Sequence, residues 1–267
     1  MGADIKKLRI RIKSVNSTLH LTKAMGLVAS SKLKKSNSAM LRSREYSDAV
    51  MSTVKMLCGA NECSQSPFLQ DNGADKTKII VIAGDRGLAG GYNANVFRLA
   101  KEFENAEFIP VGKRACDRFS KELILCEGYG YSEAKQLSEK LCREFENKEF
   151  SKLLIIFTKY NSVLSQEATV KTLLPLAKDE SACVSGAVFE PDELTVLNSI
   201  VSEYLAGIIY SLVCESYACE VAARRNAMDS AGKNAQQMID DLRLKYNRAR
   251  QGAITQEITE IVAGSGE

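Results

Sequence analysis

The chain has 267 residues, of which 45% are hydrophobic and 26% charged, so it can bury a core and form one or two domains. The formal net charge is only +3, but residues 1–48 hold eleven Lys and Arg against three acidic residues, a net charge of +8. A basic segment of this size indicates an acidic partner, such as nucleic acid, an acidic protein surface or membrane headgroups, or else a solvated helix face.

The chain has eight cysteines but no C-x-x-C pair, and His20 is its single histidine. We therefore expect no metal site and no disulfide framework, and we predict reduced thiols in a cytosolic protein. No run approaches the ~20 apolar residues that span a bilayer, so direct membrane insertion is not expected.

Residues 1–58 are predicted to form one long helix, because residues 1–66 contain no proline. Mostly apolar residues recur there at alternating steps of three and four, which is typical of a coiled coil with basic flanks. This seam consists of Ile5, Leu8, Ile12, Val15, Leu19, Thr22, Gly26, Ala29, Leu33, Ser36 and Met40. The turn-forming residues 58–76 then indicate a linker.

Residues 76–190 are predicted to form a central Rossmann-like α/β domain. Short continuous apolar runs at 79–83, 107–111 and 153–157 are typical of strands that are buried on both faces. Residues 167–176 alternate and indicate an edge strand that ends at Pro175. Helices are expected at 92–104, 112–121 and 131–147.

The turn "GDRGLAGGYNANV" (84–96) follows a buried strand and opens a helix, which is where phosphate-binding loops lie. Its first three glycines are three residues apart and match neither common nucleotide-binding pattern, and Asp85 would repel a phosphate. The favoured interpretation is a tight turn that presents Asp85 and Arg86 at the surface as a protein contact, with no cofactor. A nucleotide-binding α/β protein with coiled-coil arms stays open as the alternative.

Residues 191–267 are predicted to form a second long helix, with Pro191 at its first position. One stripe contains Leu205, Ile208, Leu212, Cys219 and Ala222, interrupted by Glu215; a thinner one contains Ala231, Ala235, Met238, Leu242, Tyr246 and Ala249. Neither long helix can bury its stripe alone, so an antiparallel coiled coil of the two chain ends is expected. Residues 248–262 are polar nearly all round, which leaves open what they contact.

No arrangement for catalysis is visible, since any His-based site must use His20, which lies in the basic coiled-coil segment. Tryptophan is absent and the other aromatic residues are scattered, so no stacking platform for nucleic acid is expected. We predict a non-catalytic component without catalytic, cofactor-binding or metal-binding residues.

Three blocks carry a resemblance to a known family: "LTKAMGLVASSKLKK" (21–35), "GDRGLAGGYN" (84–93) and "AARRNAMDSAGKNAQQMIDDLRLKYNRARQGAITQEITEIVAG" (222–264). Together they make the whole chain similar to the gamma subunit of F-type ATP synthases. The resemblance implies a central rotor shaft, present in one copy, that transmits rotation of the membrane c-ring to the hexamer of three alpha and three beta subunits. That rotation drives ATP synthesis, or ATP-driven ion pumping in reverse.

The resemblance also implies contact residues. Those matching family positions that face the beta subunits or the foot of the shaft are Arg250, Gln251, Thr255, Asp85, Arg86, Lys23, Met25 and Glu190. Lys32, Lys34 and Lys35 are expected to face the acidic beta-subunit lever as well. Further implications are contact with the epsilon subunit near Glu190 and a peripheral location on the cytoplasmic side of a bacterial cell membrane.

Overall fold

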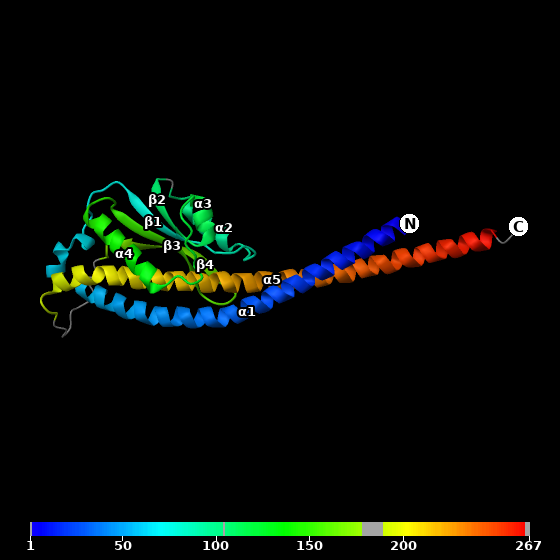
Figure 1. Ribbon diagram of the computed structural model, residues 1–267, viewed down its shortest axis with the longest axis horizontal. Helices are drawn as coiled ribbons and strands as arrows, with labels where there is room; N and C mark the ends of the chain where they lie inside the picture. Colours follow the sequence, from blue (N-terminus) through cyan, green and yellow to red (C-terminus); the bar gives the residue numbers. More distant parts are fainter. Residues whose placement is uncertain (1, 104, 178–188, 265–267) are drawn as a thin grey trace. The chain divides into compact units, whose positions relative to one another are not determined.

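The computed structural model describes residues 2–103, 105–177 and 189–264 (Figure 1). Its elements are α1 (Gly2–Cys58), two 3-10 turns η1 (Glu62–Gln65) and η2 (Pro67–Leu69), β1 (Thr77–Ile82), α2 (Tyr92–Ala100), β2 (Ala106–Val111), α3 (Lys113–Phe119), α4 (Tyr131–Glu146), β3 (Lys152–Tyr160), β4 (Gln166–Leu174) and α5 (Glu193–Gly264). The chain divides into two compact units: Met1–Ser30 with Arg224–Glu267, and Ser31–Ala223.

The first unit is an antiparallel pair made by the beginning of α1 and the end of α5. Val15 and Leu19 are buried together with Ala235 and Ile239. Further along α1, a Cβ added to Gly26 would lie 3.7 Å from the Cβ of Met228. Residues with higher numbers in α1 thus contact residues with lower numbers in α5, so the two helices are antiparallel. The predicted pairing of the two chain ends is confirmed.

The buried stripe of α5 in this unit differs from the predicted one at a single position. Met238 is 44% exposed, whereas Ile239 is 1% exposed. A step of four residues from Ala235 keeps the next side chain on the buried face of the helix, and a step of three turns it outward. The assignment of Met238 to the stripe is therefore wrong, and Ile239 takes its place.

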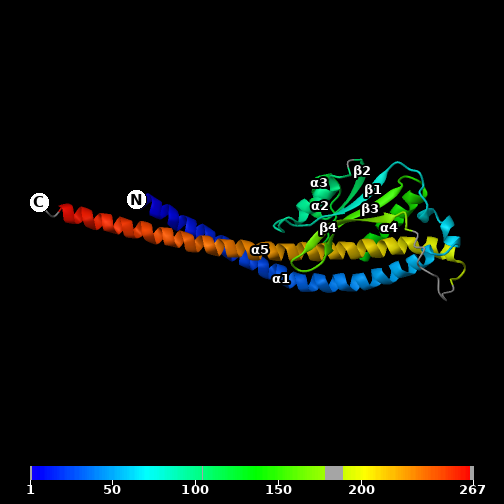
Figure 2. The same ribbon diagram turned by 180° about the vertical axis from the view of Figure 1, so that it is seen from behind.

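The second unit contains a four-stranded sheet in the order β2-β1-β3-β4. The first three strands are parallel, and β4 is an antiparallel edge strand, as its alternating sequence predicts. Ile79 and Val81 of β1 pack in a cluster with α2 and α3, while Ile80 and Ile82 pack in the larger cluster with α1, α4 and α5 (Figure 2). Helices on both faces explain the unbroken apolar run of β1.

The segment interpreted as a linker, residues 58–76, is built into the core of this unit. Cys63 and Phe68 are buried, and the Phe68 ring stacks on Phe145 at 5.9 Å between centroids. The Phe68 carbonyl accepts a hydrogen bond from the Leu176 amide at 2.8 Å. The turn-forming composition therefore marks two short 3-10 turns rather than an unpacked connection.

Helix α5 begins later than predicted. The Asp192 carboxylate accepts hydrogen bonds from the Thr195 amide and hydroxyl, both at 2.8 Å, so Asp192 is the N-cap residue. Pro191 precedes this cap and is not the first helical residue, which corrects the prediction. The predicted segment limits of 58, 76 and 190 stay predictions.

Among the described residues, α5 contains the one stretch that is long and apolar enough to cross a membrane, and 61% of that stretch is buried inside the protein. Its apolar residues, such as Leu205 and Ile209, pack in the large core cluster. The seven described cysteines are free thiols, and Cys183 lies outside the described residues.

Gly112, the residue between β2 and α3, is expected to tolerate no other side chain without a large loss of stability. Its φ of 94° and ψ of 142° lie in a region open essentially to glycine alone, and an added Cβ would lie 1.8 Å from the Ala83 carbonyl oxygen. Gly112→Ala should lower the free energy of unfolding by at least about 3 kcal/mol, measured by urea denaturation. Gly128→Ala is the matched control, because Gly128 has a φ of 89° but open space around it. Equal losses in both variants would refute the predicted clash.

Candidate functional site

The turn between β1 and α2 lies where an α/β domain would bind a ligand. In the sheet, β2 lies on one side of β1 and β3 on the other, so the connections run in opposite directions from β1. The carboxyl ends of β1 and β3 therefore form a topological switch point. Residues 84–91 leave β1 at this edge and lead into α2. The position alone is therefore compatible with a phosphate-binding turn.

Three amide groups at the start of this turn donate to side chains of the chain itself. The amides of Asp85 and Arg86 each donate to the Glu220 carboxylate at 3.1 Å, and Glu220 of α5 is 1% exposed. The Gly84 amide donates to Asn93 Oδ1 at 2.8 Å. A Cβ on Gly84 would lie 2.8 Å from Glu220 Cδ, so glycine is what admits the carboxylate. The first three amide donors after β1 are therefore taken, which disfavours phosphate binding at the start of the turn.

Asp85 points into the protein rather than toward solvent. Its Oδ1 accepts the amides of Lys113 and Cys126 at 3.1 and 2.9 Å, and its Oδ2 accepts the amide of Glu127 at 2.7 Å. Asp85 is 8% exposed. The expectation that the turn presents Asp85 at the surface is therefore wrong, because three otherwise unpaired amides draw the carboxylate inward.

Arg86, in contrast, is exposed. Its guanidinium lies 3.3 Å from the carboxylate of Glu127, which also pairs with Lys32 of α1. The hydrogen bond from Lys32 is the main cause that lowers the pKa of Glu127. Of the basic residues expected to face a partner, Lys32 is thus engaged within the chain, while Lys34 and Lys35 are exposed.

The remaining predicted contact residues lie at separate places. In the first unit, Arg250, Gln251 and Thr255 lie on exposed surface of α5, and the Thr255 hydroxyl donates to the Gln251 carbonyl at 2.9 Å. An exposed line of Ile254, Ile258, Ile261 and Val262 runs along the same end of the helix. Lys23 of α1 is exposed and Met25 half-buried, and Glu190, in the second unit, is exposed just before α5.

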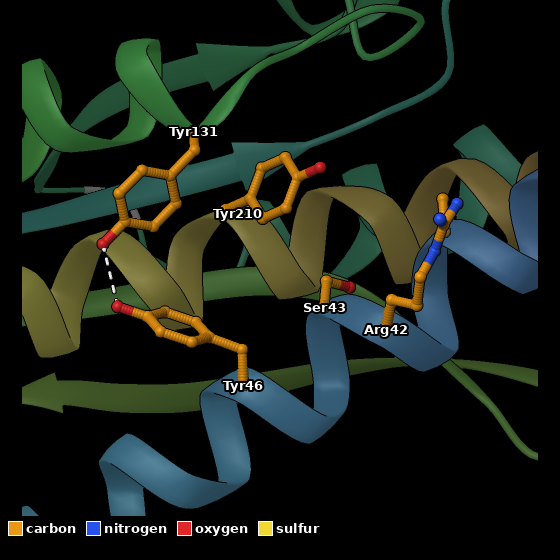
Figure 3. A pocket seen from close by; sticks show the side chains of 6 residues that line it. Arg42, Ser43, Tyr46, Tyr131 and Tyr210 are labelled. Carbon is orange, nitrogen blue, oxygen red and sulfur yellow. Dashed lines mark hydrogen bonds between the residues drawn. The ribbon is translucent and has the colours of Figure 1, made fainter.

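A pocket of about 430 Å³ in the second unit was not foreseen from the sequence (Figure 3). Its lining consists of Ala39, Arg42, Ser43, Tyr46, Tyr131 and Tyr210. The hydroxyls of Tyr46 and Tyr131 lie 3.2 Å apart, and Tyr131 donates to Glu203 at 2.6 Å. Burial, followed by these hydrogen bonds, raises the pKa of Tyr131, so its phenol stays protonated. The three tyrosines are far apart in sequence, and no spacing signals that they meet.

No group of three His, Cys, Asp or Glu side chains within the described part of the chain is arranged to hold a metal ion. The described residues form an antiparallel helix pair and an α/β unit in which Glu220 of α5 occupies the turn after β1.

Comparison with known proteins assigns the family. The family model described as ATP synthase matches residues 4–266. The chain is 36% identical over 299 residues to the sodium ion specific ATP synthase gamma chain of Acetobacterium woodii, covering 99% of both proteins. It is 37% identical over 281 residues to the ATP synthase gamma chain of Ruminococcus albus, covering 98% of both. The chain belongs to the ATP synthase gamma chain family.

Solved structures show the same fold. A chain from the Euglena gracilis mitochondrial ATP synthase (OSCP/F1/c-ring, rotational state 3) matches with a TM-score of 0.69 at 17% identity, covering 99% of this chain and 94% of that one. A chain from the central stalk and c-ring of the Tetrahymena thermophila mitochondrial enzyme matches with a TM-score of 0.64 at 23% identity, covering 79% and 99%.

Proposed function

We infer that this chain is the central rotor shaft of an F1Fo ATP synthase. It transmits rotation of the membrane c-ring to the catalytic hexamer of alpha and beta subunits and so drives ATP synthesis, or ion pumping when ATP is hydrolysed. The observation that carries this inference is the match to gamma chains along nearly the whole chain. The paired terminal helices agree with it, because the seam from Ile5 to Met40 is the half-buried or buried side of α1.

The chain itself is proposed to be non-catalytic, with nucleotides bound by the hexamer. The burial of Glu220 against the amides of Asp85 and Arg86 supports this, because it closes the edge of the sheet where a nucleotide would lie. One copy per complex is proposed, in contact with alpha, beta and epsilon subunits and the c-ring. The bacterial origin of the relatives supports a peripheral location on the cytoplasmic side of a cell membrane.

The end of α5 is proposed to work through contacts that form and break as the shaft turns. Arg250, Gln251 and Thr255 offer exposed hydrogen-bonding groups, while the apolar line beside them is narrow. Such a surface gives each beta subunit different contacts in successive orientations, and differential contact energy is what shifts a protein among conformational states. Lys23, Met25, Arg86 and Glu190 are proposed as further contacts, whereas Asp85 is proposed to act by shaping the turn that carries Arg86.

The test of this assignment is the double substitution Arg250→Ala with Gln251→Ala. Loss of two hydrogen-bonding side chains at a transient contact should lower ATP hydrolysis by the reconstituted hexamer roughly tenfold. The fold should stay intact, because both side chains are exposed.

The matched control is Arg243→Ala with Lys245→Ala, since both residues are exposed on the same helix. Each variant is first purified with alpha and beta subunits in the ratio 1:3:3, which separates an assembly defect from a contact defect. Full activity of the assembled Arg250 and Gln251 variant would refute the assigned contact. Failure of the unmodified chain to assemble would refute the rotor function.

A further inference from the structure

Strand β3 continues beyond the end of the strand next to it. β1 pairs with β3 only as far as Val81 and Ile156, whereas β3 runs on to Tyr160. On the other side, β4 pairs with β3 along this last part, from Phe157 to Tyr160. No strand in the described part of the chain therefore pairs with the other edge of the segment 157–160, although Thr158 is buried. Buried amide and carbonyl groups at such an edge require other partners.

Side chains of α5 supply those partners. The Thr158 amide donates to Ser216 Oγ at 3.1 Å, and the Tyr160 amide donates to Glu215 Oε1 at 2.8 Å. The Cys219 thiol donates to the Thr158 carbonyl at 3.3 Å. All three α5 residues are buried. The helix thus takes the place of a missing strand along the end of β3.

The same stretch of α5 also holds neighbouring elements. Glu220 accepts the amides of Asp85 and Arg86 in the turn after β1. The Ser216 carbonyl accepts the hydroxyl of Tyr92, the first residue of α2, at 2.9 Å, and Glu215 pairs with Arg44 of α1 at 2.9 Å. Less than two turns of α5 therefore bind two strand ends, one helix of the α/β domain and the partner helix α1.

The earlier part of α5 contacts the domain in a different way. Most of its buried residues from Leu197 to Val213 join the apolar core cluster. Its polar contacts with the domain are between side chains: Asn198 accepts a hydrogen bond from Ser66, and Glu203 contacts Tyr131 and Lys135. Apolar contacts are non-directional and tolerate small shifts of one surface over another. Hydrogen bonds weaken steeply when the distance or the angle changes. The polar contacts of residues 215–220 differ from those of Asn198 and Glu203 because they hold backbone amides and a carbonyl of β3 and of the turn after β1. They therefore fix the position of the sheet on the helix most directly.

We propose that Glu215, Ser216, Cys219 and Glu220 form a mechanical joint that fixes the α/β domain in one register on α5 and α1, so that torque passes between them without slip. This proposal rests on the proposed rotor function. It assigns the four residues as positioning residues that act through the backbone of β3 and of the turn after β1. Each backbone amide in the joint has its own acceptor side chain, so the loss of one hydrogen bond can be measured at one amide in the chain by itself.

The first experiment is amide hydrogen exchange on the full chain. Ser216→Ala should speed exchange of the Thr158 amide at least tenfold and leave the Asp85 amide unchanged, because each of these amides has its own acceptor. Ser216→Thr keeps the hydroxyl and should restore protection. Ser211→Ala replaces another buried serine of α5 and is the control. Unchanged exchange at Thr158 would overturn the joint.

A second variant keeps the test valid if Ser216→Ala does not fold. Glu220→Gln preserves the shape of the side chain but leaves one acceptor oxygen for two amides, so exchange of Asp85 or Arg86 should accelerate at least tenfold. Wild-type protection of both amides in this variant would also contradict the joint.

The second experiment measures coupling in the assembled complex. Ser216→Ala combined with Glu220→Gln should lower the ions pumped per ATP hydrolysed at least threefold, while Ser211→Ala should not. Accelerated exchange with unchanged coupling would overturn the mechanical role of the joint. Failure of the unmodified chain to assemble with alpha and beta subunits would instead contradict the rotor function, and the exchange result would stand by itself.

Discussion

Replacing Asp85 with alanine is expected to destabilise residues 31–223 more than any other single loss of a polar side chain near the turn. Its carboxylate accepts the amides of Lys113, Cys126 and Glu127, and Asp85 is 8% exposed. A hydrogen bond to a charged group contributes about 1.5–3 kcal/mol, so the three together predict a loss of about 4 kcal/mol or more. Urea denaturation followed by tyrosine fluorescence measures it, since the chain has no tryptophan.

Asp75→Ala is the matched control for this change. Asp75 is an exposed aspartate just before β1 in the same unit, so its removal should change stability by no more than about 0.5 kcal/mol. In the Asp85 variant, we also expect faster hydrogen exchange at the three amides. A midpoint within experimental error of the unmodified chain would show that other groups satisfy those amides.

The second large effect is expected from Leu242→Pro. Leu242 lies within α5 and packs against the cluster formed by Val15, Leu19, Ala235 and Ile239. Proline removes one helical hydrogen bond and collides with the preceding turn, which costs about 3 kcal/mol or more. Because most residues of α5 around Leu242 are exposed, packing there can do little to offset the broken helix, and the variant should lose most coupled ATP hydrolysis in the assembled complex.

Leu242→Ala separates the backbone effect from the packing effect. It removes the same side chain but keeps the helical hydrogen bond, so it should retain most of the activity that proline abolishes. Circular dichroism gives the helix content of both variants. Normal assembly and full coupling of the proline variant would contradict a shaft that must be continuous through residue 242.

The sequence predicts much of this fold because the hydrophobic patterns of its long helices and of its buried strands are both clear. Steps of three and four in residues 5–40 identify the buried side of α1, and continuous apolar runs locate β1, β2 and β3. The end of β3 is the exception: its apolar run stops at Phe157, but the strand continues to Tyr160. That extension pairs with β4 on one edge and is hydrogen-bonded to Glu215 and Ser216 on the other. The two α5 residues lie more than fifty residues away, and local pattern carries no signal for such a contact.

The site is less predictable for the same reason. Glycine spacing shows that the turn after β1 departs from phosphate-binding patterns, but it does not show that Glu220 fills it. Nor does spacing reveal the inward direction of Asp85, because its three amide partners lie in a later part of the chain. A buried glutamate interrupting an apolar helix stripe, as Glu215 does, is the signal that points to such a partner.

The carboxylate of Glu220 acts as a covalently attached ligand of the turn after β1. A group attached by the fold has an effective concentration of about millimolar or higher at its site. A free phosphate compound would have to displace Glu220 and leave its charge buried without the Asp85 and Arg86 amides. An α/β framework of the kind that receives small molecules therefore has this part of its edge filled by a side chain of the same chain.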